Sequence, residues 1–517
     1  MSTIGRAAIV VSSGILASRL LGFLRDVILA ALLGRGVEAD LYNQAFAIPD
    51  FLFFLMAGGY ISITLVPILS RHLAVDDTAG ANRSFTAVAK AVGGLMALLT
   101  VVTMILARPL TEAVFAGVPQ EQLPELVTLV RIVLPAQFFF VMGALLMAAQ
   151  YAHRRFVVPT LAPLVYNLSI IAGGLIAAAL GEPGPAGFIW GALAGVILGN
   201  FGLQWWGAAR LGVRLERGVS VKHEAVPEYF VLALPLMIGQ SAVALDEVFM
   251  RVFGQLGGLG DTSALNYARR VNMVPVGVIA QAAGVAAFPF LAGLYAEGKL
   301  TEMAATVGRA LRSSFAVAGL AAAAAVGLAA PIIQVAYRRG AFTDEDTILV
   351  SGLLAIYGLS IPLWAAHQVY TRAFYAQTRM WLPVGIGTAT TVIAIPLYWW
   401  GATSLGASGV AVASVSVMAI YTVTMAWVWH RRHPSPETFA ALGRMLIAAV
   451  PAGGLGWLTV RLFGLGPGTS TWEAAAALVV GGLVTLISYT GILRAARSPE
   501  LDLVINRWRR RRYDDTR

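Results

Sequence analysis

Near its N-terminus the chain carries the stretch Ser18-Arg19-Leu20-Leu21-Gly22-Phe23-Leu24-Arg25-Asp26, in the middle of an apolar run from about Ala7 to Leu33. No proline interrupts this run, and a helix needs about 20 apolar residues to cross the hydrocarbon core of a bilayer. The run therefore predicts a membrane-spanning helix that carries two arginines and an aspartate at bilayer depth.

The polar and small residues of this helix share one face. At about 100° per residue, this face is made of Gly14, Ser18, Arg19, Gly22, Arg25 and Asp26. The opposite face is apolar and is made of Leu16, Leu20, Phe23, Leu24 and Val27. Charges at this depth usually face a water-filled cavity or a partner. One interpretation is an internal Arg25–Asp26 or Arg19–Asp26 ion pair. We prefer a basic wall that meets an anion, because one acid cannot neutralise two arginines.

The composition predicts an all-α polytopic membrane protein. The 517 residues are 58% hydrophobic and 12% charged, whereas a soluble protein has about 25% charged residues. The net charge of +10 comes mostly from loops and the C-terminal tail, a pattern that orients membrane proteins, so we expect no nucleic-acid partner. The sequence has no cysteine, no P-loop and no histidines at metal-ligand spacing, so we expect no enzyme activity, cofactor or metal site.

Apolar segments separated by short polar breaks predict 14 transmembrane helices. Their approximate ranges are 7–33, 40–70, 84–107, 125–151, 157–181, 187–209, 227–256, 263–295, 306–337, 347–376, 381–400, 405–429, 438–464 and 472–495. We expect an N-lobe of six helices (1–224), a C-lobe of six helices (225–434), two appended helices (435–498) and a basic cytoplasmic tail (499–517). Arginines gather after the even-numbered segments, which predicts that both termini are cytoplasmic.

A short motif occurs twice. Tyr151-Ala152-x-x-Arg155-x-x-x-Pro159 recurs 224 residues later as Tyr375-Ala376-x-x-Arg379-x-x-x-Pro383. Both copies join the fourth and fifth segments of a lobe. Since six helices separate the copies, the two lobes should share one topology and be related by a pseudo-two-fold axis along the membrane normal. Transporters of this kind hold their substrate between the lobes.

Further charged residues lie in the predicted second, seventh and eighth helices. They are Asp40 and Asp50, then Asp246, Glu247 and Arg251, then Ser263, Arg269 and Arg270. If these helices line the cavity, Arg19, Arg25, Arg269 and Arg270 come together there, and guanidinium groups suit a diphosphate because each donates two parallel hydrogen bonds. The plainer interpretation of a single charge such as Asp40, Arg251 or Arg269 is a helix-end residue that reaches the membrane interface.

Asp246 is a candidate ligand for a coupling cation, although a structural hydrogen bond between helices explains it equally well. Small residues in the last two segments, Gly453, Gly454, Gly456, Gly481 and Gly482, favour either a shallow groove for a lipid tail or ordinary helix packing.

The N-terminal stretch, together with Ala39-Asp40 and Phe46-x-x-Pro49, resembles the opening of the MurJ (MviN) lipid II flippases of the MOP superfamily. Later matches are Ser263, Tyr267-Ala268-x-Arg270, Pro275-x-Gly277-Val278, Arg339-Gly340-x-Phe342-Thr343 and Phe374-Tyr375. The resemblance covers essentially the whole chain, including 14 helices with both ends inside.

The resemblance implies a flippase that moves undecaprenyl-diphosphate-linked peptidoglycan precursor (lipid II) from the inner to the outer leaflet of the bacterial cytoplasmic membrane by alternating access. It implies substrate binding by Arg19, Arg25 and Arg270, with Asp26, Asp40 and Ser263 as further polar cavity residues, and a lipid-tail groove beside the last two helices. We add Ser18, Asp50 and Arg269 as candidate substrate-binding residues from their positions in the predicted helices. We expect a monomer surrounded by membrane lipids, driven by a coupling cation or the membrane potential.

Three positions depart from the family pattern. The family commonly has an arginine where this chain has Phe53 and an acid where it has Gly58, and Asp50 replaces an asparagine. The alternatives are another MOP exporter, of drugs or polysaccharide-lipid intermediates, or a non-transporting scaffold for cell-wall enzymes.

Overall fold

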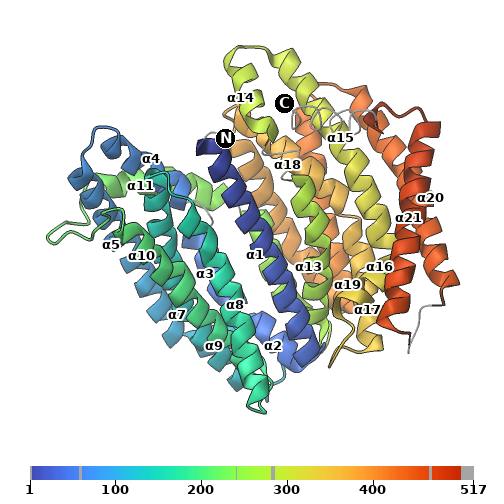
Figure 1. Ribbon diagram of the computed structural model, residues 1–517, viewed down its shortest axis with the longest axis horizontal. Helices are drawn as coiled ribbons and strands as arrows, with labels where there is room; N and C mark the ends of the chain where they lie inside the picture. Colours follow the sequence, from blue (N-terminus) through green and yellow to red (C-terminus); the bar gives the residue numbers. More distant parts are fainter. Residues whose placement is uncertain (1–2, 57–60, 240, 281–285, 465–468, 502–517) are drawn as a thin grey trace. The chain divides into compact units, whose positions relative to one another are not determined.

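The computed structural model describes residues 3–56, 61–239, 241–280, 286–464 and 469–501. The regular elements of this part of the chain are helices (Figure 1). They form two compact units, residues 1–263 and 264–517. The predicted all-α class is thereby confirmed.

The first unit contains the helices up to the start of α13. These are α1 (Thr3–Leu33), α2 (Val37–Ala45), α3 (Ala47–Met56), α4 (Ile61–Leu73), α5 (Thr78–Ile105), α6 (Ala107–Val114), α7 (Leu123–Ala152), α8 (Val157–Ala179), α9 (Pro185–Gly195), the π-helical η1 (Val196–Leu203), α10 (Gln204–Ala209), α11 (Ala225–Gly239) and α12 (Ser241–Gly254). Helix α13 (Asp261–Ala280) begins in the first unit and continues in the second.

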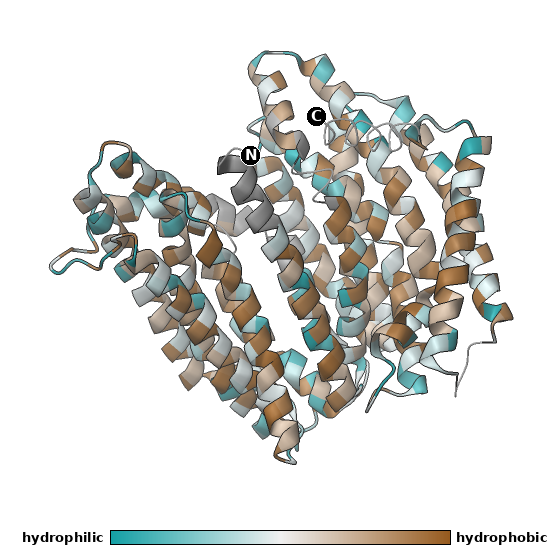
Figure 2. Cartoon of the chain, viewed as in Figure 1, coloured by the Kyte–Doolittle hydropathy of each residue, from teal (hydrophilic) through white to brown (hydrophobic). Residues whose placement is uncertain are grey.

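The second unit contains the remaining helices. They are α14 (Ala286–Ala296), α15 (Leu300–Gly327), α16 (Ala329–Tyr337), α17 (Asp344–Gly358), α18 (Ile361–Ala376), α19 (Trp381–His430), α20 (Pro436–Leu462) and α21 (Thr471–Ala495). Apolar residues run along these helices, and polar residues gather near helix ends and in the connecting turns (Figure 2).

Ten of the described helical stretches are long and apolar enough to cross a membrane. One of them, α19, has 50 residues and a non-helical residue inside it, Gly406 at φ 58°, where the sequence predicts a break between the segments 381–400 and 405–429. The segments predicted at 7–33, 227–256 and 263–295 correspond to α1, α11–α12 and α13–α14, which are not among the ten. The total of 14 stays a prediction, as do the lobe boundaries.

The repeated motif has the same backbone in both copies. After α7, Arg155 N–H donates to Gln150 O (2.9 Å), and after α18, Arg379 N–H donates to Phe374 O (3.0 Å). Between these donors and acceptors lie Arg154 and Thr378, both at φ 58°, in the left-handed region that non-glycine residues seldom adopt. Two such turns, 224 residues apart, support an internal repeat.

Other breaks recur at nearly the same spacing. Helices α5 and α15 are followed by the C-cap residues Leu106 and Leu328, and the short helices α6 and α16 begin directly after these residues. The turns after α8 and within α19 contain glycines with positive φ, Gly181 (85°) and Gly406 (58°). The sequence of long helix, short helix and helical hairpin is therefore present in each unit.

Small residues bring helices close in the second unit. A Cβ at Gly327 would lie 2.3 Å from the backbone O of Gly453, and a Cβ at Gly456 would lie 2.3 Å from Thr485 Oγ1. In contrast, nothing lies within 4 Å of a Cβ built at Gly454. Gly453 and Gly456 therefore serve helix packing, and a lipid-tail groove beside α20 and α21 stays a proposal.

The polar connector after α10 is fastened to α5 in the first unit. Asn82, Thr86 and Lys90 lie one helical turn apart on α5 and hydrogen-bond the connector backbone. Asn82 Nδ2 donates to Gly212 O (3.1 Å), Thr86 Oγ1 accepts from Glu216 N–H (3.0 Å) and Lys90 Nζ donates to Val219 O (3.0 Å). We call this segment, residues 212–219, the strap.

The turn that leads into α5 is held by a small polar cluster. Asp77 accepts the backbone N–H of Gly80 (2.8 Å) and contacts His72 Nδ1 (3.0 Å), and His72 Nε2 lies 3.2 Å from the hydroxyl of buried Ser84. These hydrogen bonds lower the pKa of Asp77, with the Gly80 N–H contributing most and His72 next. Asp77 is thus a helix N-cap.

Candidate functional site

The polar face of α1 packs against α8. A Cβ at Gly14 would lie 1.7 Å from Thr160 Cγ2, and a Cβ at Gly22 would lie 3.7 Å from Asn167 Oδ1. Glycine at these positions lets α8 approach closely enough for its side chains to reach Arg25. On the opposite face, Leu16, Leu20 and Leu24 are exposed, in agreement with the predicted apolar face.

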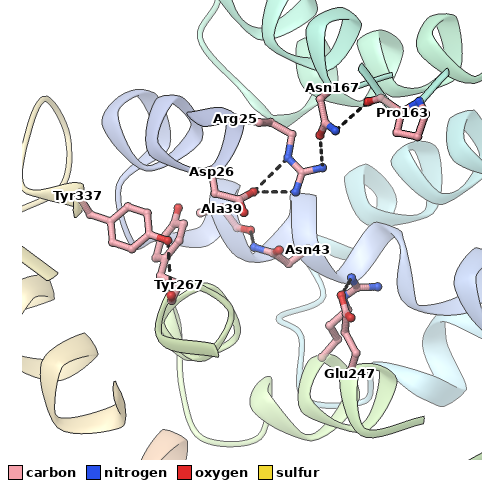
Figure 3. Close-up of polar contacts among 10 residues, drawn as sticks. Arg25, Asp26, Ala39, Asn43, Pro163, Asn167, Glu247, Tyr267 and Tyr337 are labelled. Carbon is pink, nitrogen blue, oxygen red and sulfur yellow. Dashed lines mark hydrogen bonds and ion pairs between the residues drawn. The ribbon is translucent and has the colours of Figure 1, made fainter. Parts of the chain in front are cut away.

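Arg25 lies within a hydrogen-bonded group formed by α1 and α8 (Figure 3). Its Nε and Nη2 both donate to Asp26 Oδ1, at 3.0 and 2.7 Å, and its Nη1 donates to Asn167 Oδ1 at 3.4 Å. The exposed fractions of the Arg25 and Asp26 side chains are 12% and 8%. The structure therefore contains the internal Arg25–Asp26 pair that was the alternative to an open basic wall.

Asn167 is a site residue that the sequence did not reveal. Its Nδ2 donates to the carbonyl O of Pro163 (2.9 Å), which leaves Oδ1 turned toward Arg25. The amide lies 142 residues from Arg25 in sequence, and only the packing of α8 on Gly22 brings the two together. The one signal in the sequence that could have indicated Asn167 is its position one helical turn after a proline, Pro163, within an apolar segment.

The two other candidates on α1 differ in exposure. Arg19 is exposed and Ser18 is half-buried. No ion pair joins Arg19 to another residue in the described ranges. Arg19 and Arg25 thus share a helix face but have different surroundings.

Asp40 binds the first turn of α13. Its Oδ2 accepts the backbone N–H of Gly260 and its Oδ1 accepts that of Ser263, both at 2.7 Å, while the Ser263 hydroxyl donates to Gly260 O (3.0 Å). All three residues are buried. A carboxylate at a helix N-terminus satisfies otherwise unpaired N–H groups and interacts favourably with the helix dipole. Asp40 therefore fastens α2 to the helix that leads into the second unit.

Arg251 on α12 joins two acids. Its Nη1 donates to Asp50 Oδ2 on α3 (2.6 Å) and its Nη2 donates to Glu247 Oε1 one turn earlier (2.5 Å). Asp50, a predicted cavity residue, thus lies in an ion-pair network. Two carboxylates share one guanidinium here, so this cluster is not an anion site as it stands.

An aromatic row continues from Phe53 on α3. The ring centroid of Phe53 lies 5.6 Å from that of Phe140 on α7, which lies 5.4 Å from that of Tyr166 on α8. Tyr166 precedes Asn167 directly. An apolar ring therefore lies where the resemblance led us to look for an arginine, and Gly58 lies outside the described residues.

The remaining candidates are Asp246 in the first unit and two arginines in the second. Asp246 on α12 is buried and has an interaction partner. Arg269 and Arg270 are half-buried on the part of α13 in the second unit and also have interaction partners. No group of three or more metal-ligating side chains occurs within the described part of the chain.

Solved structures of transporters have a similar fold. A solved structure titled "Lipid II flippase MurJ, inward closed conformation" matches with a TM-score of 0.79 and 21% identity, covering 94% of this chain and 99% of that one. An inward-facing multidrug resistance MATE family transporter of the MOP superfamily matches with a TM-score of 0.66 and 17% identity, covering 82% and 95%.

Sequence comparison then gives the family. The sequence model described as "Lipid II flippase MurJ" matches residues 29–473. A probable lipid II flippase MurJ of Rhizobium meliloti (strain 1021) is 28% identical over 460 residues, 85% of this chain and 83% of the relative. The lipid II flippase MurJ of Burkholderia cenocepacia is 25% identical over 75% of this chain and 76% of its own length. The chain belongs to the lipid II flippase MurJ family.

Proposed function

We propose that this protein is a flippase that moves lipid II from the inner to the outer leaflet of the bacterial cytoplasmic membrane. Membership of the MurJ family supports the substrate. The observation that carries the proposal is the Arg25–Asp26–Asn167 group, because it holds a largely buried guanidinium on an otherwise apolar helix.

Arg25 is suited to an anion that comes and goes. A diphosphate can take the place of Asp26 and of the longer Asn167 contact, since a guanidinium donates two parallel hydrogen bonds to phosphate as readily as to carboxylate. When the lipid leaves, Asp26 pairs with Arg25 again. The arginine is never left buried without a counter-ion, a state that is costly in a low-dielectric site.

The other candidates have supporting roles in this proposal. Arg19 and Arg270 would meet the diphosphate, with Ser18 and Arg269 beside them. Asp40, with Ser263, would hold the start of α13 during one part of an alternating-access cycle, and Asp50 would fix α3 to α12 through Arg251. Translocation moves the lipid without making or breaking a covalent bond, so we propose no enzymatic activity.

We also propose a monomer with both termini in the cytoplasm, as the arginine distribution predicts. Energy would come from the membrane potential, which supplies about 2.3 kcal/mol per charge per 100 mV, or from a coupling cation. Asp246 is the candidate ligand for such a cation, and unchanged ion-dependent transport in an Asp246→Asn variant would exclude it.

Complementation tests the flippase proposal. In a bacterium depleted of its own lipid II flippase, we expect growth with the wild type and no growth with Arg25→Ala. We expect weak growth with Arg25→Lys, because lysine keeps the charge but not the two parallel donors. Arg108→Ala is the matched control, since Arg108 is exposed on α6 and pairs only with Glu112 one turn away among the described residues.

The possible results separate substrate from site. Growth with every variant would keep the flippase and discard the Arg25 site. No growth with abundant wild type would favour a different lipid-linked substrate or a drug. Normal growth of a variant with Arg19, Arg25 and Asp26 all neutralised would favour a scaffold that transports nothing.

A further inference from the structure

A histidine is buried within the membrane-spanning part of the second unit. His367 on α18 is 5% exposed. Its ring packs against Tyr421 of α19, with centroids 4.7 Å apart, and against the edge of Trp364, 6.0 Å away. Ionisable residues at such positions in membrane proteins usually have a functional role.

The ring nitrogens of His367 are poorly satisfied. Nε2 lies 3.5 Å from the hydroxyl of Thr371, at the outer limit of a hydrogen bond, and Nδ1 has no hydrogen-bond partner among the described residues. Buried polar atoms in native proteins are nearly always paired. Because neither ring nitrogen has a strong hydrogen-bond partner, the nitrogen that carries the lone pair in the neutral ring is available to bind a proton.

The internal repeat shows that the fold does not require a side chain here. The residue 224 positions earlier, at the same place before the repeated turn, is Gly143 on α7. A Cβ there would lie 1.9 Å from the backbone O of Asn200 in η1. In the first unit, the backbone of η1 therefore packs directly on the glycine of α7. In the second unit, an imidazole on α18 and a tyrosine on α19 fill the corresponding helix contact.

A series of polar groups leads from the end of α19 toward His367. His430 Nδ1 lies 3.2 Å from His433 O, and His430 Nε2 lies 3.0 Å from the hydroxyl of Tyr370. Thr371, the next residue of α18, is the one that contacts His367. His430 and His433 are only half-buried. Tyr370 and Thr371 are consecutive residues of α18, and no hydrogen bond joins their two hydroxyls in the described part of the chain.

The surroundings of His367 are otherwise apolar. From α19 the titratable group that faces it is Tyr421, whose hydroxyl donates to Pro383 O (3.0 Å). From α13 and α15, the residues packed on the start of α18 are apolar: Val276, Ile279, Ala318, Ala322 and Ala325. The titratable residue of α14 is Tyr295. No ion pair joins His367 to a charged group in the ranges that the structure covers.

We propose that His367 is a proton-binding site and that the proton it binds is the ion that drives the cycle. The unprotonated ring nitrogen takes up the proton with its lone pair and becomes N–H, and no other bond changes. The new positive charge cannot stay in an apolar helix crossing without a partner. Proton uptake therefore favours a rearrangement of α18 against α19. The driving role rests on the proposed flippase function, whereas proton binding does not.

Translocation of fluorescent lipid II in proteoliposomes tests the coupling. We expect the wild-type rate to change several-fold when a pH gradient is imposed at constant membrane potential. The response should be lost in His367→Gln. His153→Gln is the matched control, because His153 ends α7 at the corresponding turn of the first unit and should respond like the wild type.

A second measurement needs no lipid. Protonated imidazole quenches a nearby indole, so the tryptophan fluorescence of the purified protein should titrate with pH. Because His433 also contacts an indole, that of Trp429, the measurement uses a His433→Gln background, in which the transition should be absent after either Trp364→Phe or His367→Gln. Thermal unfolding shows whether each variant is folded.

Three results would overturn the proposal: a full pH-gradient response in folded His367→Gln, loss of the response in Asp246→Asn but not in His367→Gln, or no His367-dependent fluorescence transition. Absence of lipid II translocation by the wild type, with that transition present, would reject the flippase and keep the proton site.

Discussion

At the scale of single residues, the charges in the apolar helices have partners that the sequence could not place. Arg25 pairs with its neighbour Asp26 and with the distant Asn167. Asp40 binds two backbone N–H groups at the start of α13. In each case a charge that hydropathy marks as unusual is neutralised or hydrogen-bonded, as burial in a low-dielectric medium requires.

Asp40 should matter for stability as well as for transport. In Asp40→Ala the N–H groups of Gly260 and Ser263 both lose a charged acceptor, so we expect the free energy of unfolding to fall by about 2–3 kcal/mol. Asp40→Asn keeps one acceptor and should lose less. Thermal unfolding of the purified protein in detergent measures both.

The control for Asp40 lies on the same helix. Glu38 is exposed on α2, and Glu38→Ala should leave the unfolding temperature unchanged. An equal fall of the unfolding temperature in Glu38→Ala and Asp40→Ala would mean that α2 is sensitive to the loss of any charge. It would contradict a specific role of the hydrogen bonds from Gly260 and Ser263 to Asp40.

Asp77 gives a prediction about pH. Its pKa in the folded protein is lower than in the unfolded chain. Its contribution to stability is therefore complete above the unfolded value, about 3.9 for aspartate, and is lost as the pH falls through the lower folded value. Protection of the first-turn amides of α5 against hydrogen exchange should fall below about pH 4, and Asp77→Asn should show lower protection already at neutral pH. An acid response that persists in Asp77→Asn would assign it to another group.

At the scale of elements, glycines set how closely helices approach. Gly143 lies against the π-helical stretch η1, a rare type of helix. Within the first unit, this contact and those of Gly14 and Gly22 bring α7 against η1 and α1 against α8.

Gly143→Ala should therefore destabilise the first unit. The added methyl would meet a backbone oxygen at 1.9 Å, which cannot rotate away as a side chain can, and overpacking of this kind costs about 1–3 kcal/mol. Gly94→Ala is the matched control in another apolar helix, because nothing lies within 4 Å of its Cβ position. Its unfolding temperature should stay the same or rise, since alanine favours helix over glycine.

At the scale of the whole molecule, hydropathy alone predicts a polytopic membrane protein, because a long chain with so few charged residues is explained by burial of its helices in a bilayer. The repeated Tyr-Ala-x-x-Arg motif likewise predicts the repeat that the turns at Arg154 and Thr378 support. The candidate site was harder to predict. Helix periodicity places Arg25 and Asp26 on one face but cannot show that Gly22 admits Asn167, nor that Arg251 reaches Asp50 from a helix 201 residues away in sequence.

The number of membrane crossings can be measured directly, because the chain has no cysteine and single cysteines can be added without removing any. With both termini inside, cysteines at Gln120 and Ser404 should react with a membrane-impermeant maleimide added outside the cell. Those at Ser220 and Ser435 should react only after the membrane is opened. Protection of Ser404 from outside reagent would mean that α19 does not form a hairpin and that the count of 14 is too high.

The strap gives the connector between α10 and α11 very little slack. Because residues 212–219 are hydrogen-bonded to α5, the free tether before α11 is reduced to about five residues, which span at most about 3.5 Å each. A displacement of α11 beyond that reach has to break the hydrogen bond of the strap to Lys90 first, then the one to Thr86 and then the one to Asn82. The connector thus limits how far α11 can move, and these three hydrogen bonds set the force needed to move it further.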